Sequence, residues 1–258
     1  MKNILVLLIT LAIGNFAYAL QDDRIDDYSF ESSELKTEST PYFAIAGGAT
    51  FTFQFANFDA VNNHLKANNF NVGEFSGQVS LWGGEGFTGL VYVPNMRIGF
   101  FSYGGSKVLT NDSVAFSTSN VKREVEYTIG LTGISLEYAY VPLKSFAIVG
   151  GLSFGKGDIS IQTYHSTSET KWEDYKPDVD QYNNLNLAEA NYWFVKPNVH
   201  FEYALTNFLM FRFGASYNYT FGSDWNQNYS SALKNVPDDL NANALQLQAG
   251  IFIGLFNY

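Results

Sequence analysis

The 258-residue sequence contains no cysteine, and this absence excludes two classes of exported protein. A small secreted domain stapled by disulfides requires cysteine. A lipoprotein also requires one, because its lipid is attached to a cysteine that follows the cleavage site. With only three scattered histidines besides, the chain also lacks the residues for a zinc-ligand cluster.

Basic residues and long apolar runs are also scarce. The chain has 15 Lys and Arg against 25 Asp and Glu, a formal charge of −10, which argues against nucleic acid as a partner. Outside the first 19 residues no apolar run reaches the roughly 18 residues that a transmembrane helix needs. Aromatic residues nevertheless make up 17% of the chain. High aromatic content without a helical span favours a membrane β-barrel, whose strands hide their hydrophobicity by alternation.

The first 40 residues predict an export signal followed by an acidic leader. Residues 1–19 combine Lys2, an apolar stretch from Ile4 to Ile13 and a small-x-small cleavage site, Ala17-Tyr18-Ala19. This pattern is typical of a cleaved signal peptide, and a buried N-terminal helix is the alternative. Residues 20–40 hold seven acids and two bases with few apolar side chains, and we expect a disordered periplasmic leader there.

Period-two alternation dominates the remaining residues, 41–258. In residues 209–221 the odd positions are apolar or aromatic, whereas the even positions include Arg212, Ser216, Asn218 and Thr220. Residues 191–203 repeat the pattern, with polar Lys196 on the even face. Because alternate side chains of a strand point to opposite faces, both segments predict strands with one apolar face. Further strands are predicted over 42–55, 75–93, 97–109, 121–141, 145–162 and 244–258.

Two positions interrupt this pattern. In the segment 121–141 the apolar face changes parity near Gly133, and a β-bulge there would explain the change. Pro197 falls in the middle of a predicted strand, where every N–H of a closed sheet should be paired, so we expect a bulge or a local water.

The connections alternate in length. Short turns are predicted at Pro94-Asn95, Pro142-Leu143-Lys144 and Thr206-Asn207, and long polar loops over 56–74, 110–120, 163–188 and 223–243. Eight strands with this alternation predict an all-β fold, a closed antiparallel transmembrane β-barrel with short periplasmic turns and long extracellular loops. Ten strands are the alternative count. Both termini would then lie in the periplasm of a bacterial cell.

The export signal, the eight alternating segments and the ending GIFIGLFNY resemble the small outer-membrane barrels of the OmpA/OmpX type. The resemblance is architectural and extends over nearly all of the chain after residue 19. It implies that the last strand, with Phe252, Phe256 and terminal Tyr258, is read by the barrel-assembly machinery. It also implies outer-membrane lipid and lipopolysaccharide as surroundings. Because Ile251, Ile253 and Leu255 are apolar as well, the orientation of this strand stays open.

Arg212 is the most informative single residue, because it lies between Phe211 and Phe213. Facing lipid it would cost roughly 2–4 kcal/mol at the bilayer midplane, so we place it in the lumen. The short turn at 206–207 sets Arg212 either opposite His200 and diagonal to Glu202, or directly opposite Glu202. In both registers a carboxylate is near the guanidinium. The predicted polar network of the lumen comprises Arg212, Glu202, His200, Glu137, Lys196, Glu124 and Glu126.

The loops supply the other candidate residues. Loop 163–182 mixes acids with aromatics, which suits contact with an extracellular protein or glycan, although a merely solvated loop is the plain alternative. It lacks the D-x-D-x-D-G spacing of a calcium loop, so no metal site is predicted. In the first loop Phe58, Val61 and Leu65 recur at helical spacing and predict a short helix over the barrel mouth. The binding candidates are Trp172, Glu173, Asp174, Tyr175, Asp178 and Asp180.

The chemistry-bearing motifs are few. The sequence has neither a nucleotide-binding loop nor a G-x-S-x-G motif, and no cofactor is expected. The lumen network could in principle supply an acid, a base and a cation, yet ion pairs that fill a small barrel explain it as well. We therefore expect a binding, adhesion or envelope-structural role carried by the extracellular loops. The alternatives are a narrow, porin-like or gated channel through the lumen and a lipid-modifying outer-membrane enzyme.

Overall fold

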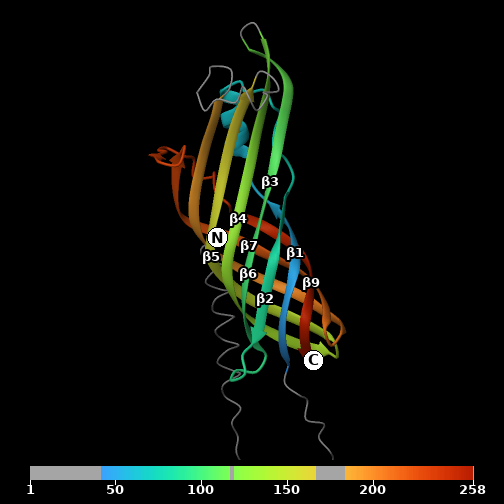
Figure 1. Cartoon of the computed structure of the whole chain (residues 1–258). Coiled ribbons are helices and arrows are strands. Elements are labelled where there is room, and N and C mark those ends of the chain that lie inside the picture. Colours follow the sequence, from blue (N-terminus) through green and yellow to red (C-terminus); the bar gives the residue numbers. More distant parts are fainter. Residues whose placement is uncertain (1–41, 117–118, 167–183, 258) are drawn as a thin grey trace, which may run out of the picture. The chain divides into compact units, whose positions relative to one another are not determined.

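The computed structural model describes residues 42–116, 119–166 and 184–257, and these form one closed antiparallel barrel (Figure 1). From β1 to β7 each strand pairs with the next along the chain, β7 then pairs with β9, and the pairing of β9 with β1 closes the ring. A two-residue strand, β8 (Ser231–Ala232), pairs only with β7. The long strands are β1 (Phe43–Phe55), β2 (Val79–Gly89), β3 (Met96–Phe116), β4 (Ser119–Leu143), β5 (Phe146–Ser166), β6 (Asn184–Thr206), β7 (Leu209–Gln227) and β9 (Ala244–Asn257).

The predicted fold class is confirmed, and the alternation of side chains is its direct cause. In β7, Arg212, Ser216 and Asn218 are buried in the lumen, while Phe213 and Tyr217 are exposed on the outside. The last strand, whose orientation the sequence left open, follows the same rule. Phe252 and Phe256 point into the lumen, and the aliphatic residues between them face outward. A sheet that is polar on one face and apolar on the other closes into this form when its surroundings are apolar.

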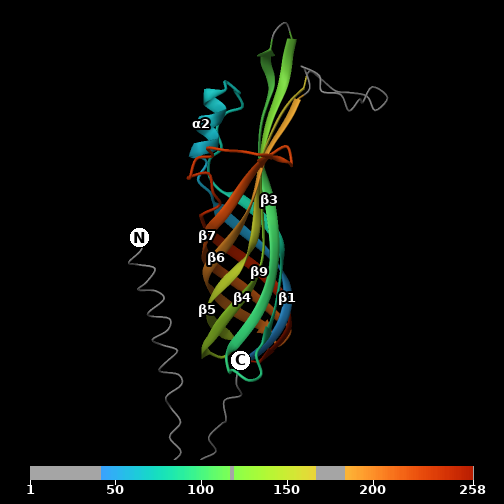
Figure 2. The ribbon, with the colours of Figure 1, turned by 90° about the vertical axis from the view of Figure 1, so that its left-hand side faces the viewer.

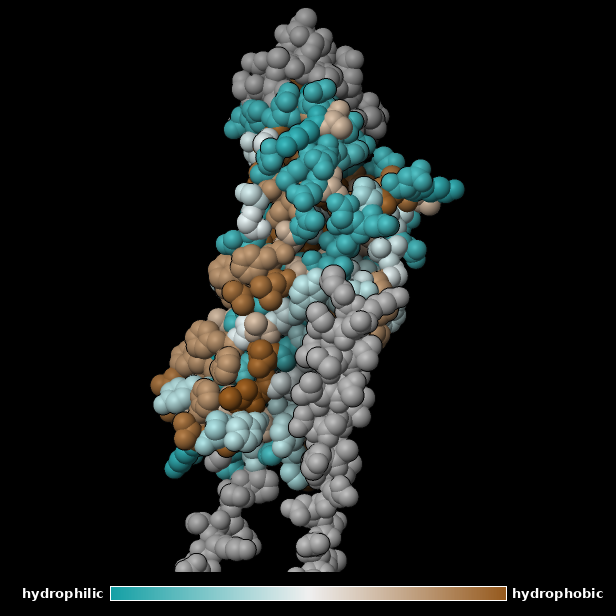
Figure 3. Space-filling model, turned by 180° about the vertical axis from the view of Figure 1, so that it is seen from behind, coloured by the Kyte–Doolittle hydropathy of each residue, from teal (hydrophilic) through white to brown (hydrophobic). Residues whose placement is uncertain are grey.

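In the half of the barrel nearer the short turns, the lower half in Figure 1, the outward side chains form an apolar belt. Aromatic residues lie at both limits of the belt, for example Tyr138 and Tyr203 at one and Trp193 and Tyr219 at the other. From Phe211 to Phe221 the outward positions of β7 remain apolar, in agreement with the roughly 9–11 residues that a tilted strand needs to cross a bilayer. Figure 3 shows the apolar residues of the visible face gathered in this half, with hydrophilic residues gathered above.

Beyond the belt the polarity of the two faces reverses. In β4 the outward residues change from Ile134 to Thr132, Thr128 and Glu126, while the inward residues change from Ser135 to apolar ones. The register with β3 and β5 continues through Gly133 without interruption, so the predicted bulge there is wrong. The apparent change of parity arises because the strand leaves the apolar surroundings. Its outer face then meets water, and its inner face packs into an apolar core.

The strands are longer than predicted, and much of the predicted loop sequence belongs to them. The predicted loop 110–120 is largely strand, because β3 continues to Phe116 and β4 begins at Ser119. Likewise β5 reaches Ser166, β6 begins at Asn184 and β7 continues to Gln227. As a result β3, β4, β5 and β6 continue beyond the belt as a projecting sheet, formed by residues 105–116, 119–131, 157–166 and 184–192 (Figures 1 and 2).

Pro197 does not cause a bulge, so of the two predicted outcomes the bulge is wrong and the local water stays a prediction. The β6–β7 register is the same on both sides of it, from Val195↔Tyr219 to Asn198↔Ser216. Between these two pairs only positions 196 and 197 lack partners in β7, while Pro197 keeps its place opposite Leu152 of β5. Proline therefore removes ladder contacts toward β7 without changing which residues face the lumen.

The predicted helix over the barrel mouth is present as α2 (Asp59–Ala67). Its residues Val61 and Leu65, and Phe58 just before it, are buried against Tyr127 and other inward residues of the upper barrel. Asn62 holds the following segment in place, because its side chain donates to the carbonyl of Phe75 at 2.9 Å and accepts from the Phe75 N–H at 2.8 Å. None of the helices in the described ranges is long and apolar enough to cross a membrane.

Candidate functional site

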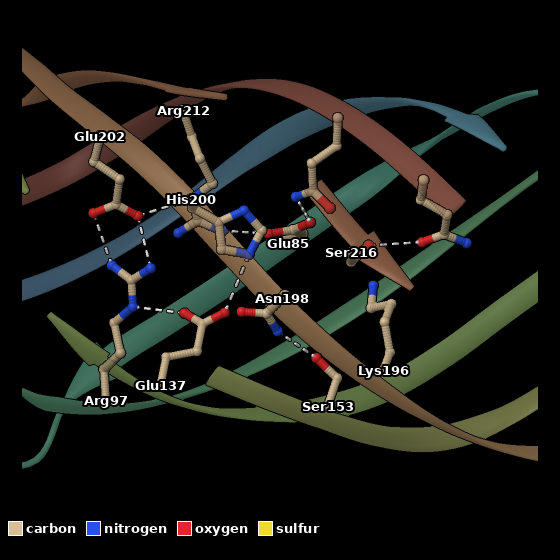
Figure 4. A network of polar contacts seen from close by, with 12 residues as sticks. Glu85, Arg97, Glu137, Ser153, Lys196, Asn198, His200, Glu202, Arg212 and Ser216 are labelled. Atoms are coloured by element: carbon tan, nitrogen blue, oxygen red, sulfur yellow. Dashed lines mark hydrogen bonds and ion pairs between the residues drawn. The ribbon is translucent and has the colours of Figure 1, made fainter. Parts of the chain in front are cut away.

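Seven ionisable side chains converge in the lumen at the level of the belt, and we call them the charged layer (Figure 4). Six are at least nine-tenths buried, and the side chain of Glu85 is 11% exposed. Three carboxylates face two guanidinium groups and one ammonium group, so with neutral histidine the layer carries no net charge. Burial of charges at this depth is tolerable only with such compensation. The seven residues are Glu85, Arg97, Glu137, Lys196, His200, Glu202 and Arg212.

Glu202 is the centre of the charged layer. Both terminal nitrogens of Arg97 donate hydrogen bonds to it, Nη1 to Oε2 at 2.9 Å and Nη2 to Oε1 at 2.6 Å. Arg212 adds a third contact, from Nε to Oε1 at 2.9 Å. The fork of a guanidinium matches a carboxylate in this bidentate way, which makes the pair both strong and directional.

The remaining carboxylates are each held by a guanidinium. Arg97 Nε donates to Glu137 Oε2 at 2.7 Å, and Arg212 Nη1 donates to Glu85 Oε2 at 2.5 Å. His200 Nε2 lies 3.6 Å from Glu137 Oε1, beyond hydrogen-bond distance. The two arginines and three glutamates therefore form one connected network across β2, β3, β4, β6 and β7.

Each cation of the charged layer lies over an aromatic ring. The guanidinium carbon of Arg97 lies 4.1 Å from the ring centre of Phe87, and that of Arg212 lies 4.2 Å from Phe252. Lys196 lies 4.0 Å from the ring centre of Phe101 and donates a hydrogen bond to the Tyr103 hydroxyl. Lys196 has no carboxylate within ion-pair distance among the residues described, so ring faces and a phenol replace one.

The lumen is filled on both sides of the charged layer. Toward the short turns it is closed by an apolar cluster that includes Ala44, Ala204, Met210 and Phe256. On the other side lies a larger apolar cluster to which α2 contributes. The cavity beside the charged layer has a volume of about 10 Å³, on the order of the space that one water molecule needs. A small barrel filled in this way has a packed interior rather than a pore.

The predicted lumen network is brought together in large part. Arg212, Glu202, His200, Glu137 and Lys196 all belong to the charged layer. Of the two predicted hairpin registers, the structure has Glu202 directly opposite Arg212, with His200 opposite Gly214.

Glu124 and Glu126 do not belong to the charged layer. They lie on the outer face of β4 beyond the belt, where Glu124 pairs with Lys122 at 3.2 Å. Alternation alone assigned them to the lumen, because it cannot show that the surroundings of the strand have changed. The loop candidates Trp172, Glu173, Asp174, Tyr175, Asp178 and Asp180 lie outside the described residues, as do the export signal, the leader and Tyr258.

Arg97, Glu85 and Tyr42 are members of the network that the sequence did not single out. Tyr42 accepts a hydrogen bond from Arg97 Nη1 at 3.0 Å. Glu85 lies in the run Trp82-Gly83-Gly84-Glu85-Gly86, where glycines blur the alternation. The usable signal was charge balance, since a predicted lumen network of four glutamates with one arginine and one lysine needs further cations.

The lumen contains residue types that hydrolytic enzymes use, but they are not placed where a substrate outside the barrel could reach them. Ser153 and Asn198 are hydrogen bonded at 3.1 Å, with His200 two residues farther along β6, but all three face the lumen. A lipid substrate outside the barrel does not reach them. Within the described ranges no group of three or more histidine or acidic side chains could hold a metal ion.

Comparison with known proteins gives structural similarities only. No protein-family model and no curated sequence matches the chain. Among solved structures, it is similar to a major outer membrane protein from Thermus thermophilus (9% identity, TM-score 0.45), covering 82% of this chain and 99% of that one. It is also similar to Ail of Yersinia pestis in complex with the heparin analogue sucrose octasulfate (6%, 0.37, 84% and 98%). A third is Acinetobacter baumannii CarO2 (11%, 0.36, 82% and 99%). At such identities the similarity concerns general architecture alone.

Proposed function

We propose that this protein is an outer-membrane anchor that presents its projecting sheet as an extracellular binding surface. The observation that carries the proposal is the reversal of polarity along β4, β5 and β6, which leaves a sheet with a polar outer face beyond the apolar belt. A barrel whose only role was to fill the membrane would need no such extension. In this orientation the short turns and both termini lie in the periplasm.

The edge of the projecting sheet is the expected contact. After Gly104, which pairs with Trp82, the register partners of β3 within the described ranges all belong to β4. Lys107 and Asn111 donate to carbonyls of residues 71–78, so that segment flanks this edge as far as Asn111. Beyond it, a strand edge without a backbone partner can accept an extended peptide by main-chain hydrogen bonding. The outward side chains of the projecting sheet are mainly acidic, with Glu124, Glu126, Asp158 and Glu189 against Lys122 and Lys156, and Glu124 and Glu126 lie on β4, the strand next to this edge. A basic, extended segment of a partner protein fits both features.

Two immobilised peptides test this contact. One alternates Lys and Thr, and the other alternates Lys and Pro, so that the charge is equal but the second cannot pair as a strand. We expect the purified protein to bind the first peptide at least ten times more tightly. The double variant Glu124→Lys/Glu126→Lys should lose most of this binding, whereas Glu74→Lys with Lys66→Glu should keep it. Equal binding of both peptides would reduce the contact to charge alone, and binding of neither would exclude a basic partner.

The channel alternative has a direct test, because the lumen is packed on both sides of the charged layer. In a planar bilayer the protein should carry no steady current. A steady current that changes with Arg212→Leu or Glu202→Gln would instead establish a channel gated by the charged layer. For the enzyme alternative, lipid A from cells that overproduce the protein should have unchanged masses.

A further inference from the structure

Several side chains that line the cavity beside the charged layer have a buried polar atom without a hydrogen-bond partner. Four residues that line it, His200, Asn198, Arg212 and Gln248, each keep one enclosed polar side-chain atom with no hydrogen-bond partner among the described residues. These atoms are His200 Nδ1, Asn198 Oδ1, Arg212 Nη2 and Gln248 Oε1. A buried polar atom without a partner is costly, so four around one small cavity require an explanation.

The partners of the neighbouring atoms fix which atoms are left over. Arg212 uses Nε on Glu202 at 2.9 Å and Nη1 on Glu85 at 2.5 Å, which leaves Nη2. Gln248 donates from Nε2 to Glu85 Oε1 at 3.2 Å. Rotating that amide by half a turn would set its oxygen against a carboxylate oxygen, so Oε1 must be the unpaired atom.

From these groups we infer that the cavity is a binding site for a single ordered water molecule. A guanidinium nitrogen can only donate and an amide oxygen can only accept, while a neutral imidazole nitrogen can do either. A bound halide would need donors alone, and a bound metal cation would need acceptors alone. Water is the small ligand that both donates and accepts.

Charge and size support the same ligand. Glu85, Glu137 and Glu202 balance Arg97, Lys196 and Arg212, so the site needs no ion for neutrality. The cavity of about 10 Å³ is at the lower limit for one water, which typically makes about three hydrogen bonds. The water would connect Gln248 of β9 and Asn198 of β6 to the two-arginine network, and so complete the charged layer around the barrel.

A crystal structure of the protein at high resolution, from crystals grown in bromide, tests the inference. We expect a water within hydrogen-bonding distance of at least three of the four atoms and no anomalous bromide peak. A bromide peak in the cavity, density for a cation, or a dry cavity would each overturn the proposal.

Water-to-protein magnetisation transfer in detergent micelles gives the solution test. A long-lived water should transfer magnetisation to the ring protons of His200 in the natural protein. The signal should be lost in Asn198→Leu, which replaces a polar lining residue of the cavity by an apolar one, and kept in Ser102→Ala on the outer face. Loss in both variants, or persistence in Asn198→Leu, would contradict the site. Only variants that keep the compact gel mobility of the folded barrel are compared, and if Asn198→Leu does not fold, the crystal structure decides.

Discussion

Arg212 and Glu202 are direct register partners across the β6–β7 hairpin, with Nε 2.9 Å from Oε1. The pair explains how an arginine can lie between two outward phenylalanines. One residue of offset would place it in the apolar belt, whereas alternation places it in the lumen beside a carboxylate. The same carboxylate also holds Arg97, so its loss would leave two buried guanidinium groups without their main partner.

The first prediction concerns that carboxylate. Glu202→Gln should lower the free energy of unfolding by about 3–5 kcal/mol, because it removes one partner of a buried charge network. The same substitution at Glu124, on the outer face, should change it by less than about 0.5 kcal/mol. Urea titration of the barrel in lipid vesicles, followed by tryptophan fluorescence, measures both. Equal effects would mean that Glu124 shares the environment of Glu202.

The second prediction concerns the limit of the apolar belt. Ile134→Lys should destabilise the folded barrel by about 2–4 kcal/mol, because it sets an ammonium against the bilayer core. Thr128→Lys, six residues away on the same face of β4, should be close to neutral because that position is in water. Folding yields and unfolding midpoints in vesicles distinguish the two. A large cost at Thr128 would show that the belt extends farther along the strand.

The third prediction concerns the segment that closes the barrel mouth. Asn62→Ala removes two hydrogen bonds to Phe75, each worth about 1 kcal/mol. Amide hydrogen exchange in residues 57–78 should therefore become roughly ten-fold faster or more, while exchange in the barrel strands stays unchanged. Asn63→Ala, an exposed neighbour, is the matched control. Unchanged exchange in Asn62→Ala would show that apolar packing alone holds the segment.

The fourth prediction compares two glycines of β5. A Cβ at Gly155 would lie 2.2 Å from the Thr132 carbonyl oxygen, so Gly155→Ala should cost about 1–3 kcal/mol through overpacking. A Cβ at Gly150 meets nothing within 4 Å. Gly150→Ala should therefore be neutral, or stabilising by up to about 1 kcal/mol, since it restricts the unfolded chain. Thermal or urea unfolding of the two variants in one detergent makes the comparison, and reversed signs would contradict the packing at Gly155.

The sequence predicted the barrel, α2 and the Arg212–Glu202 pairing because each depends on local periodicity. Arg212 and Glu202 are ten residues apart and joined by a short turn, so alternation and turn length nearly determine their register. Glu124 and Glu126 were assigned to the lumen because alternation separates the two faces of a strand without showing which face is in contact with water. That depends on where the strand leaves the membrane, which is a property of all the strands together.

Glycine explains the residues that were missed. Glu85 on β2 and Arg97 on the adjacent strand β3 are close in sequence to Gly83, Gly84, Gly86 and Gly99, which lack the side chains that would mark a face. The inner glycines there have a packing role, since a Cβ at Gly83 would lie only 2.0 Å from the Ser102 carbonyl oxygen. The glycines that allow neighbouring strands to pack closely are thus the residues that interrupt the alternation of polar and apolar side chains in the sequence.

The reversal of polarity along the strands also fixes how deep the protein sits in a bilayer. A shift of two residues inward would bring Lys156 and Asp158 toward the hydrocarbon, and a shift outward would lift Ile134 and Leu152 into water. Each displaced side chain costs on the order of 1–4 kcal/mol, and several strands would move at once. In a thinner or thicker membrane the barrel therefore keeps its level, and the lipid around it must stretch or compress to match.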